Sequence, residues 1–319
     1  MNVRTPVENR MGHDHAEDVT PPSPTQWRKS PGLMVRGGLV GVAEAVPGIS
    51  GGTVSLVVGI YDRLIDAAGD TISGIKFVLT GRFSKGWATW KTVDWRFILP
   101  IIAGMSVGLI AALMTVAPLL EDHPTQTRAV LFGMIAVSVL VPLRMMRQRM
   151  RPVDWVLLVA GVVTAAILTS LPQSQVGDPS LWLVLFGTAI AINALVVPGL
   201  SGSFILMAMG LYIPVQHAVS DRDMAFIGVF FLGAVIGLSV FVKRLQWLLH
   251  HKRQATLAVL AGLMIGSLRA LWPWQDDDRM LQAPEGHLGI PILLAIIGAL
   301  IVTVALIVEA RAASKQDES

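Results

Sequence analysis

Long stretches without a charged residue restrict this chain to very few folds. Residues 181–215 contain no charge and, as one α-helix, would extend about 52 Å, whereas a bilayer's hydrocarbon core is about 30 Å thick. Only 15% of all residues are charged, against about 25% in soluble domains. The pattern predicts an all-α polytopic membrane protein with apolar blocks at about 37–61, 98–120, 129–143, 155–171, 181–215, 225–242, 255–272 and 288–308.

The blocks contain an internal duplication. VPGISG at 46–51 recurs as VPGLSG at 197–202, 151 positions later, and this shift also aligns Tyr61 with Tyr212. A second shift, of 129 positions, aligns the glycine pair at 104 and 108 with the pair at 233 and 237. Two hexapeptides that agree this closely at equivalent places indicate two repeats, divided near residue 175.

The basic residues indicate how the repeats cross the membrane. If each Pro-Gly block is a re-entrant hairpin, the N-terminus, the polar loop 62–97, the cluster 144–151, residues 243–253 and the C-terminus share one side. The positive-inside rule makes that side cytoplasmic. If all eight blocks crossed, loop 62–97 and cluster 144–151 would lie opposite the basic N-terminus. We therefore predict two inverted repeats, each a re-entrant hairpin plus three transmembrane helices, because three crossings are an odd number.

This topology divides the chain into four parts. We expect a disordered cytoplasmic tail at 1–30, a first repeat at 31–175 with its hairpin at 32–65, a second repeat at 176–309 with its hairpin at 181–215, and a cytoplasmic tail at 310–319. His13, Asp14 and His15 could bind a metal, but such a short cluster in a polar tail is typically solvated. We expect no metal, no cofactor and no nucleic acid, since basic residues of a membrane protein usually mark cytoplasmic loops.

The hairpin tips are the candidate functional site. Pro47-Gly48 and Pro198-Gly199 should end the incoming half-helices, because proline clashes with the preceding turn and glycine accepts positive φ. The following serines can cap the outgoing half-helices and leave their first N–H groups exposed. Two such N-termini meeting near the midplane would bind an anion, whereas the alternative is that small residues only allow close helix packing. The candidate phosphate-binding residues are Ser50, Gly51, Gly52, Thr53, Ser201, Gly202 and Ser203.

Charged residues near the tips are further candidates. Glu44 is the only charged residue of the block 37–61, and a carboxylate there is costly unless it is protonated, paired or wetted. It could carry a proton in exchange for substrate, or act as a protonated structural donor. Arg269 could bind the phosphate if it faces the centre, or extend to the outer surface. Arg36, Asp62 and Arg63 could receive a headgroup at the cytoplasmic edge, although membrane anchoring also explains the arginines.

The first motif carries a family resemblance. EAVPGISGGT from Glu44, continuing as GIYDRL from Gly59, together with VPGLSG at 197–202, resembles a bacterial membrane family associated with polyprenyl-phosphate transport. The resemblance covers nearly the whole chain after about residue 30. It implies a flippase of the bacterial inner membrane that returns undecaprenyl phosphate, the carrier lipid of cell-wall precursors, from the outer to the inner leaflet. The implied partners are this lipid and the bilayer, and no protein partner is indicated.

Two other functions use similar features. A transporter of a small soluble anion could use the same tips. Membrane undecaprenyl-pyrophosphate phosphatases also have inverted re-entrant hairpins and a Pro-Gly-x-Ser turn, which this sequence resembles. Their turn continues with arginine, whereas Gly51 and Gly202 follow the serines here, and Glu44 has no second carboxylate at i−4 or i+4. Phosphoryl hydrolysis would then lose its charge stabilisation, so we expect a transporter and not an enzyme.

Overall fold

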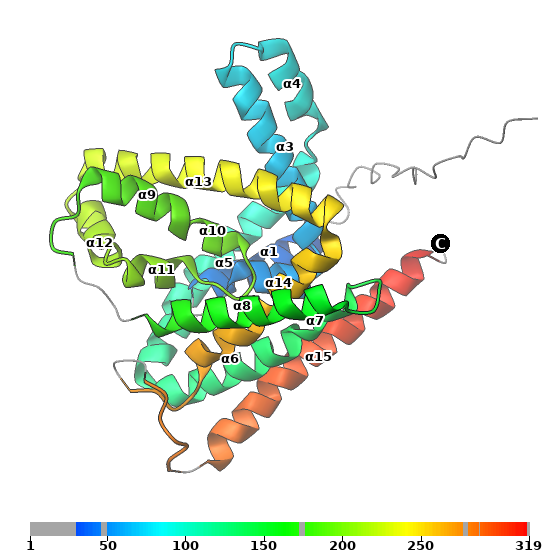
Figure 1. The fold of residues 1–319 in the computed structure, drawn as a ribbon, viewed down its shortest axis with the longest axis vertical. Helices are drawn as coiled ribbons and strands as arrows, with labels where there is room; N and C mark the ends of the chain where they lie inside the picture. The colour runs from blue at the N-terminus through cyan, green and yellow to red at the C-terminus, as the bar shows by residue number, and fades with distance from the viewer. Residues whose placement is uncertain (1–29, 46–49, 172–175, 277–279, 287, 318–319) are drawn as a thin grey trace, which may run out of the picture.

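The computed structural model of the chain is a bundle of helices (Figure 1). It describes residues 30–45, 50–171, 176–276, 280–286 and 288–317. Within these ranges there is no β-strand, only an isolated bridge between Gln275 and Leu281. The helices are α1 (Ser30–Ala45), α2 (Gly51–Val57), α3 (Tyr61–Leu79), α4 (Phe83–Thr92), α5 (Trp95–Asp122), α6 (Pro124–Ser138), α7 (Leu140–Arg144), α8 (Pro152–Ser170), α9 (Leu181–Ala191), α10 (Asn193–Val196), α11 (Gly202–Ala208), α12 (Tyr212–Ser220), α13 (Met224–His251), α14 (Arg253–Ser267), the 3-10 helix η2 (Leu268–Leu271) and α15 (Gly289–Asp317).

Six helical segments in the described part of the chain are long and apolar enough to cross a membrane. Large apolar side chains such as Val107, Met114 and Val156 stand 65–75% exposed on them, as lipid-facing side chains do. The fold is therefore that of an all-α multi-pass membrane protein, and the six segments correspond to the six predicted crossings. They are Trp95–Val116, Pro124–Arg144, Pro152–Ser170, Met224–His251, Arg253–Leu271 and Gly289–Val308.

The two Pro-Gly blocks have a different structure, because each is broken into short helices. In the first block α1 ends at Ala45, α2 has seven residues, and Gly59 with φ of +67° precedes α3. In the second, α9 and α10 lead to the tip, and Gly210 with φ of +71° separates α11 from α12. Helices α11 and α12 meet at 102°, which is the geometry of a broken span or a re-entrant loop.

The expected polar loop at 62–97 is instead two packed helices, α3 and α4, which project from the bundle at the top of Figure 1. Helix α3 forms because Ile65, Ala68 and Ile72 recur at helical spacing and contact the main apolar core. The charged residues between them gather on the opposite side of the helix. The segment is therefore an amphipathic helix and not a loop.

The same glycine contacts occur in both halves of the chain. Helix α1 packs along α5, and the equivalent helix α9 packs along α13. A Cβ on Gly104 would lie 2.0 Å from the carbonyl oxygen of Met34, and a Cβ on Gly233 would lie 2.4 Å from that of Leu185. These contacts correspond through the two sequence shifts, so the duplication extends to the way the helices pack.

The remaining crossings pack across the boundary between the halves. Helix α6 packs on α15, and α14 packs on α8. Gly133 of α6 faces the backbone of Ala295, while its counterpart Gly262 of α14 faces the backbone of Leu158. Each half thus supplies one helix to each of these two pairs. Helix α15 continues to Asp317, so most of the expected C-terminal tail at 310–319 is helical.

Candidate functional site

The second Pro-Gly tip has the geometry that its sequence predicts. Helix α10 ends at Val196, Pro198 is buried, and Gly199 has a φ of +86°. A Cβ on Gly199 would lie 2.7 Å from backbone atoms of α14, so both the dihedral angle and the contact require glycine. Pro47 and Gly48, the matching residues of the first tip, lie outside the described residues.

The outgoing half of the first hairpin contacts the second tip directly. The Ser50 hydroxyl donates to the carbonyl oxygen of Val197 at 3.0 Å, and the Gly199 N–H donates to the Thr53 hydroxyl at 2.9 Å. Ser50 and Thr53 are only 1% and 0% exposed. These hydrogen bonds join the residues after the first Pro-Gly motif to the second tip, and they satisfy backbone groups that the break in the helix leaves unpaired.

The two tip serines have different roles. Ser50 caps α2, since its hydroxyl accepts a hydrogen bond from the Gly52 N–H at 3.1 Å. Ser201 was expected to cap α11 in the same way, but its side chain makes no capping bond. Its hydroxyl instead shares a hydrogen bond of 2.9 Å with Ser203. The difference arises because Ser203 occupies the place of Gly52 and provides a competing hydroxyl.

Glu44 occupies the N-terminus of the first outgoing half-helix. Its Oε1 atom accepts a hydrogen bond of 2.9 Å from the Gly51 N–H. The first N–H groups of α2 are therefore bound within the protein and not exposed as expected. A carboxylate is suited to this place because the helix dipole attracts negative charge there. Glu44 thus places a carboxyl oxygen at the position where sequence reasoning placed a phosphate.

Arg269 is held at the end of α8, next to the second tip. Its guanidinium donates to the carbonyl oxygen of Thr169, near the end of α8, at 3.0 Å. Thr169 and Ser201 line the same small cavity, of about 10 Å³. Such a cavity has room for about one water molecule, so the second tip is closed against its neighbours in this conformation.

Two of the three candidate residues at the predicted cytoplasmic edge of the first hairpin, Asp62 and Arg63, make ion pairs. The Asp62 carboxylate accepts a hydrogen bond of 2.7 Å from Arg253, which begins α14. Arg63 pairs with Asp94 and lies with its guanidinium 4.2 Å from the ring centre of Phe97. Arg36 is half-buried on α1 and also has interaction partners.

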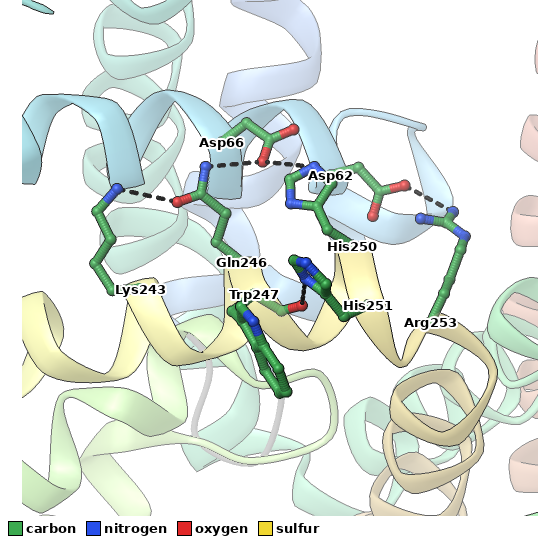
Figure 2. A network of polar contacts seen from close by, with 8 residues as sticks. All are labelled: Asp62, Asp66, Lys243, Gln246, Trp247, His250, His251 and Arg253. Carbon is green, nitrogen blue, oxygen red and sulfur yellow. Dashed lines mark hydrogen bonds and ion pairs between the residues drawn. The ribbon is translucent and has the colours of Figure 1, made fainter. Parts of the chain in front are cut away.

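Sequence analysis did not predict the polar network that joins α3 to α13 (Figure 2). The Asp66 carboxylate accepts from Gln246 at 3.1 Å and lies 3.5 Å from the His250 ring nitrogen, while Lys243 donates to Gln246 at 3.1 Å. The signal was present as acidic residues one turn apart on α3 and polar or basic residues three or four apart on α13. These residues could be identified as partners only once α3 and α13 were known to be neighbours.

Tyr61 makes a second contact that the sequence did not predict. Its hydroxyl donates to the carbonyl oxygen of Val196 at 3.1 Å, and its side chain is only 3% exposed. The repeated Gly-x-Tyr pattern marked the residue as part of the duplication without indicating its partner. Tyr61 thus connects the start of α3 to the tip of the other hairpin.

Within the described ranges, no three histidines, aspartates or glutamates are arranged to hold a metal ion. His13, Asp14 and His15 lie in the segment 1–29, outside the described residues.

The fold and the site together define a multi-pass helical membrane protein in which residues that follow the first Pro-Gly motif contact the second Pro-Gly motif. Residues 40–288 match the family described as VCA0040-like, undecaprenyl phosphate translocase-like, and the chain belongs to this family. It is similar to a polyprenyl-phosphate transporter of Vibrio cholerae, with 35% identity over 76% of this chain and 77% of the relative. It is also similar to a polyprenyl-phosphate transporter of Staphylococcus aureus, with 28% identity over 75% of this chain and 85% of the relative. No solved structure matches the chain.

Proposed function

We propose that this chain is a polyprenyl-phosphate transporter, and specifically a flippase that moves undecaprenyl phosphate from the outer to the inner leaflet of the bacterial inner membrane. The carrier lipid would thereby return for another round of cell-wall synthesis. The family description and the names of both relatives support the substrate class. The structural observation that carries the proposal is the contact between the two broken hairpins, made by Ser50 with Val197 and by Thr53 with Gly199.

The proposed architecture is a pair of inverted repeats with both termini in the cytoplasm. Two observations support it: equivalent glycines mediate α1–α5 and α9–α13 packing, and the pairs α6–α15 and α8–α14 exchange helices between the halves. A two-fold axis produces this exchange. Because each half has three crossings, the axis would lie in the membrane plane, and the hairpins would enter from opposite sides. The basic segments 62–97, 144–151 and 243–253 would then share the cytoplasmic side.

The phosphate would bind between the tips once they separate. Its oxygens would accept hydrogen bonds from the hydroxyls of Ser50, Thr53, Ser201 and Ser203 and from the N–H groups of Gly51, Gly52 and Gly202. Arg269 would add a positive charge by leaving the Thr169 carbonyl that it now contacts. The close contact between the tips supports a closed state that separates the two leaflets, which alternating access requires.

Glu44 would couple this binding to a proton. In the closed structure its carboxylate accepts the Gly51 N–H that the phosphate would use. A proton on Glu44 would remove the negative charge that the start of α2 attracts and weaken this hydrogen bond. The Gly51 N–H would then be free to donate to the phosphate. At the proposed cytoplasmic edge, Arg36, Asp62 and Arg63 would receive the headgroup as it leaves.

Leaflet-resolved transport of the lipid phosphate tests the proposal. Proteoliposomes would contain labelled undecaprenyl phosphate, and a phosphatase that cannot cross the membrane would report which headgroups become accessible outside. We expect the wild type to accelerate exchange between leaflets and to respond to a pH gradient. We expect Glu44→Gln to lose the response to pH, and the matched change Glu285→Gln, at an exposed residue away from the tips, to keep it.

Each alternative predicts a different result in the same preparation. Absence of lipid exchange under every gradient would overturn the substrate assignment, and full pH response in Glu44→Gln would overturn the proton role. Uptake of inorganic phosphate without lipid exchange would instead indicate a soluble-anion transporter. Release of phosphate from undecaprenyl pyrophosphate by the purified protein would indicate a phosphatase.

A further inference from the structure

A basic cavity of about 460 Å³ lies away from the hairpin tips, between the α7–α8 connection and the turn from α13 to α14. Its volume falls within the range of about 300–1,000 Å³ that is typical of small-molecule sites. The cationic side chains around it are Arg147, Arg151, Lys252 and Arg253, and the imidazole rings of His250 and His251 also line it. All of these residues belong to segments that we propose to be cytoplasmic.

The charges around the cavity are only partly neutralised. Arg253 is paired with Asp62, and His250 lies beside Asp66, as Figure 2 shows. Asp154, the acidic residue of the lining, accepts hydrogen bonds from the Arg151 backbone N–H and from Gln254. Within the part of the chain that the structure describes, the side chains of Arg147 and Lys252 make no hydrogen bond or ion pair. The cavity therefore retains an excess of positive charge.

Two long helices also begin at the cavity. Helix α8 starts at Pro152 and α14 starts at Arg253, and the two helices pack against each other. No side chain caps the start of α14, which adds unpaired N–H groups and the positive end of a helix dipole. The C-terminus of α13 lies at the same turn and its dipole opposes that of α14, so the N–H groups add hydrogen-bond donors while the cationic side chains attract an anion.

The fold alone does not require the basic residues. The turn from α5 to α6 is equivalent to the turn from α13 to α14, and the shared cap residues His123 and Lys252 have φ of −135° and −133°. At that equivalent turn the residues matching His250 and His251 are Glu121 and Asp122. The positive-inside rule explains the sign of these charges. It does not explain why cations from two separate segments surround one cavity.

We propose that this cavity is a second phosphate site, which binds the phosphate group of a lipid headgroup or a free phosphate ion through Arg147, Arg151 and Lys252. Arginine pairs with phosphate through two parallel hydrogen bonds, and lysine adds a point charge. The inference rests on the proposed function only for the lipid identity of the ligand. A headgroup that leaves the hairpin tips would then have a binding place on the cytoplasmic surface.

Protection of Lys252 from an amine-acylating reagent tests the site directly. Purified full-length protein in detergent would be treated in the presence of farnesyl phosphate, inorganic phosphate or the neutral alcohol farnesol, and acylation of Lys252 would be read by peptide mass spectrometry. We expect protection by a phosphate-bearing compound and none by farnesol. Protection by farnesyl phosphate alone identifies a lipid headgroup site, and equal protection by both phosphates identifies a site for the phosphate group itself.

Charge removal gives a second measurement. We expect the double change Arg147→Gln with Arg151→Gln to raise the phosphate concentration that gives half-protection of Lys252 by about tenfold or more, since charge-assisted hydrogen bonds are lost. The matched pair Arg82→Gln with Lys85→Gln removes two exposed cations elsewhere and should leave protection unchanged. Failure of both phosphates to protect Lys252 in wild type, or equal protection by farnesol, overturns the second site. These results do not depend on transport, so a failed proteoliposome assay would concern the hairpin tips alone.

Discussion

At the scale of single residues, the duplicated tip has become asymmetric. Ser50 is buried, caps α2 and donates to the carbonyl of Val197, whereas Ser201 is half-buried and bonds to the Ser203 hydroxyl. Glu44 in the first hairpin has Leu195 as its counterpart in the second. The residues that could carry a proton and those that fix the contact between the tips therefore both belong to the first hairpin.

Replacement of the two serines should reveal this asymmetry. Ser50→Ala removes a capping bond and a buried bond between the hairpins, so we expect it to lower the free energy of unfolding by about 2 kcal/mol. Ser201→Ala removes a bond between two partly exposed hydroxyls and should cost well below about 1 kcal/mol. Unfolding of both variants in detergent, followed by tryptophan fluorescence, measures the difference. Equal destabilisation would mean that Ser201 also contributes to the contact between the tips.

Residue types could be predicted at the tips, but their partners could not. The sequence indicated positive φ at Gly199 because Pro-Gly cannot continue a helix, and the structure confirms it. The hydrogen bond from the Gly51 N–H to Glu44 joins residues seven positions apart. Local sequence patterns contain no information about this pairing. The direction of the Arg269 side chain was unpredictable for the same reason, because it depends on the end of a distant helix.

At the scale of elements, the hairpins are held by glycine contacts with the crossing helices. Gly108 of α5 faces the Gly38 carbonyl, where a Cβ would lie 2.0 Å away, and Gly237 of α13 faces the Ala189 carbonyl at 2.1 Å. Close approach of backbones is a common way for helices to associate in lipid, where apolar burial alone gives little driving force. The incoming helix of each hairpin, α1 or α9, is therefore held against a helix that is long enough to cross the membrane, α5 or α13.

Alanine at these glycines should separate the helices. We expect Gly108→Ala and Gly237→Ala each to destabilise the protein by about 1–3 kcal/mol, because the added methyl group meets backbone and cannot be accommodated by a side-chain movement. Gly228→Ala, in the first turns of α13, is the matched control, since nothing lies within 4 Å of its Cβ position. It should be neutral or stabilising by up to about 1 kcal/mol. Thermal unfolding in detergent measures all three, and a neutral Gly108→Ala would contradict close packing of α1 on α5.

Helices could be predicted from the sequence where charged residues are absent, and less accurately where charged residues are abundant. The six crossings follow from apolar length, which a bilayer imposes on any spanning helix. The segment 62–97 was interpreted as a polar loop, although the buried Ile65 and the partly buried Ile72 recur at helical spacing. The charged residues of α3 share the side of the helix opposite this apolar stripe. Their number made the segment resemble a loop.

At the scale of the whole molecule, the halves are interlocked and not merely adjacent. One apolar core contains Tyr61 of the first hairpin, Val197 of the second tip, Ala165 of α8 and Val302 of α15. Because α6 packs on α15 and α14 packs on α8, neither half buries its crossings alone. A change in the position of the tips would therefore be transmitted to helices of both repeats, as alternating access by two related units requires.

The proposed inverted arrangement predicts which loops face which compartment. The chain contains no cysteine, so single cysteines can be introduced without removing native ones. We expect Ser84→Cys, in the first turn of α4, and Gln148→Cys, between α7 and α8, to react with a membrane-impermeant maleimide only in inside-out vesicles. Asp221→Cys and Glu285→Cys should react only in right-side-out vesicles, because the charge distribution assigns them to the opposite side. All four positions are exposed, so lack of reaction reflects the membrane and not burial. Labelling of Ser84→Cys and Asp221→Cys from the same side would exclude inverted repeats, since these two loops follow the equivalent hairpins and must lie on opposite faces if one repeat is inverted.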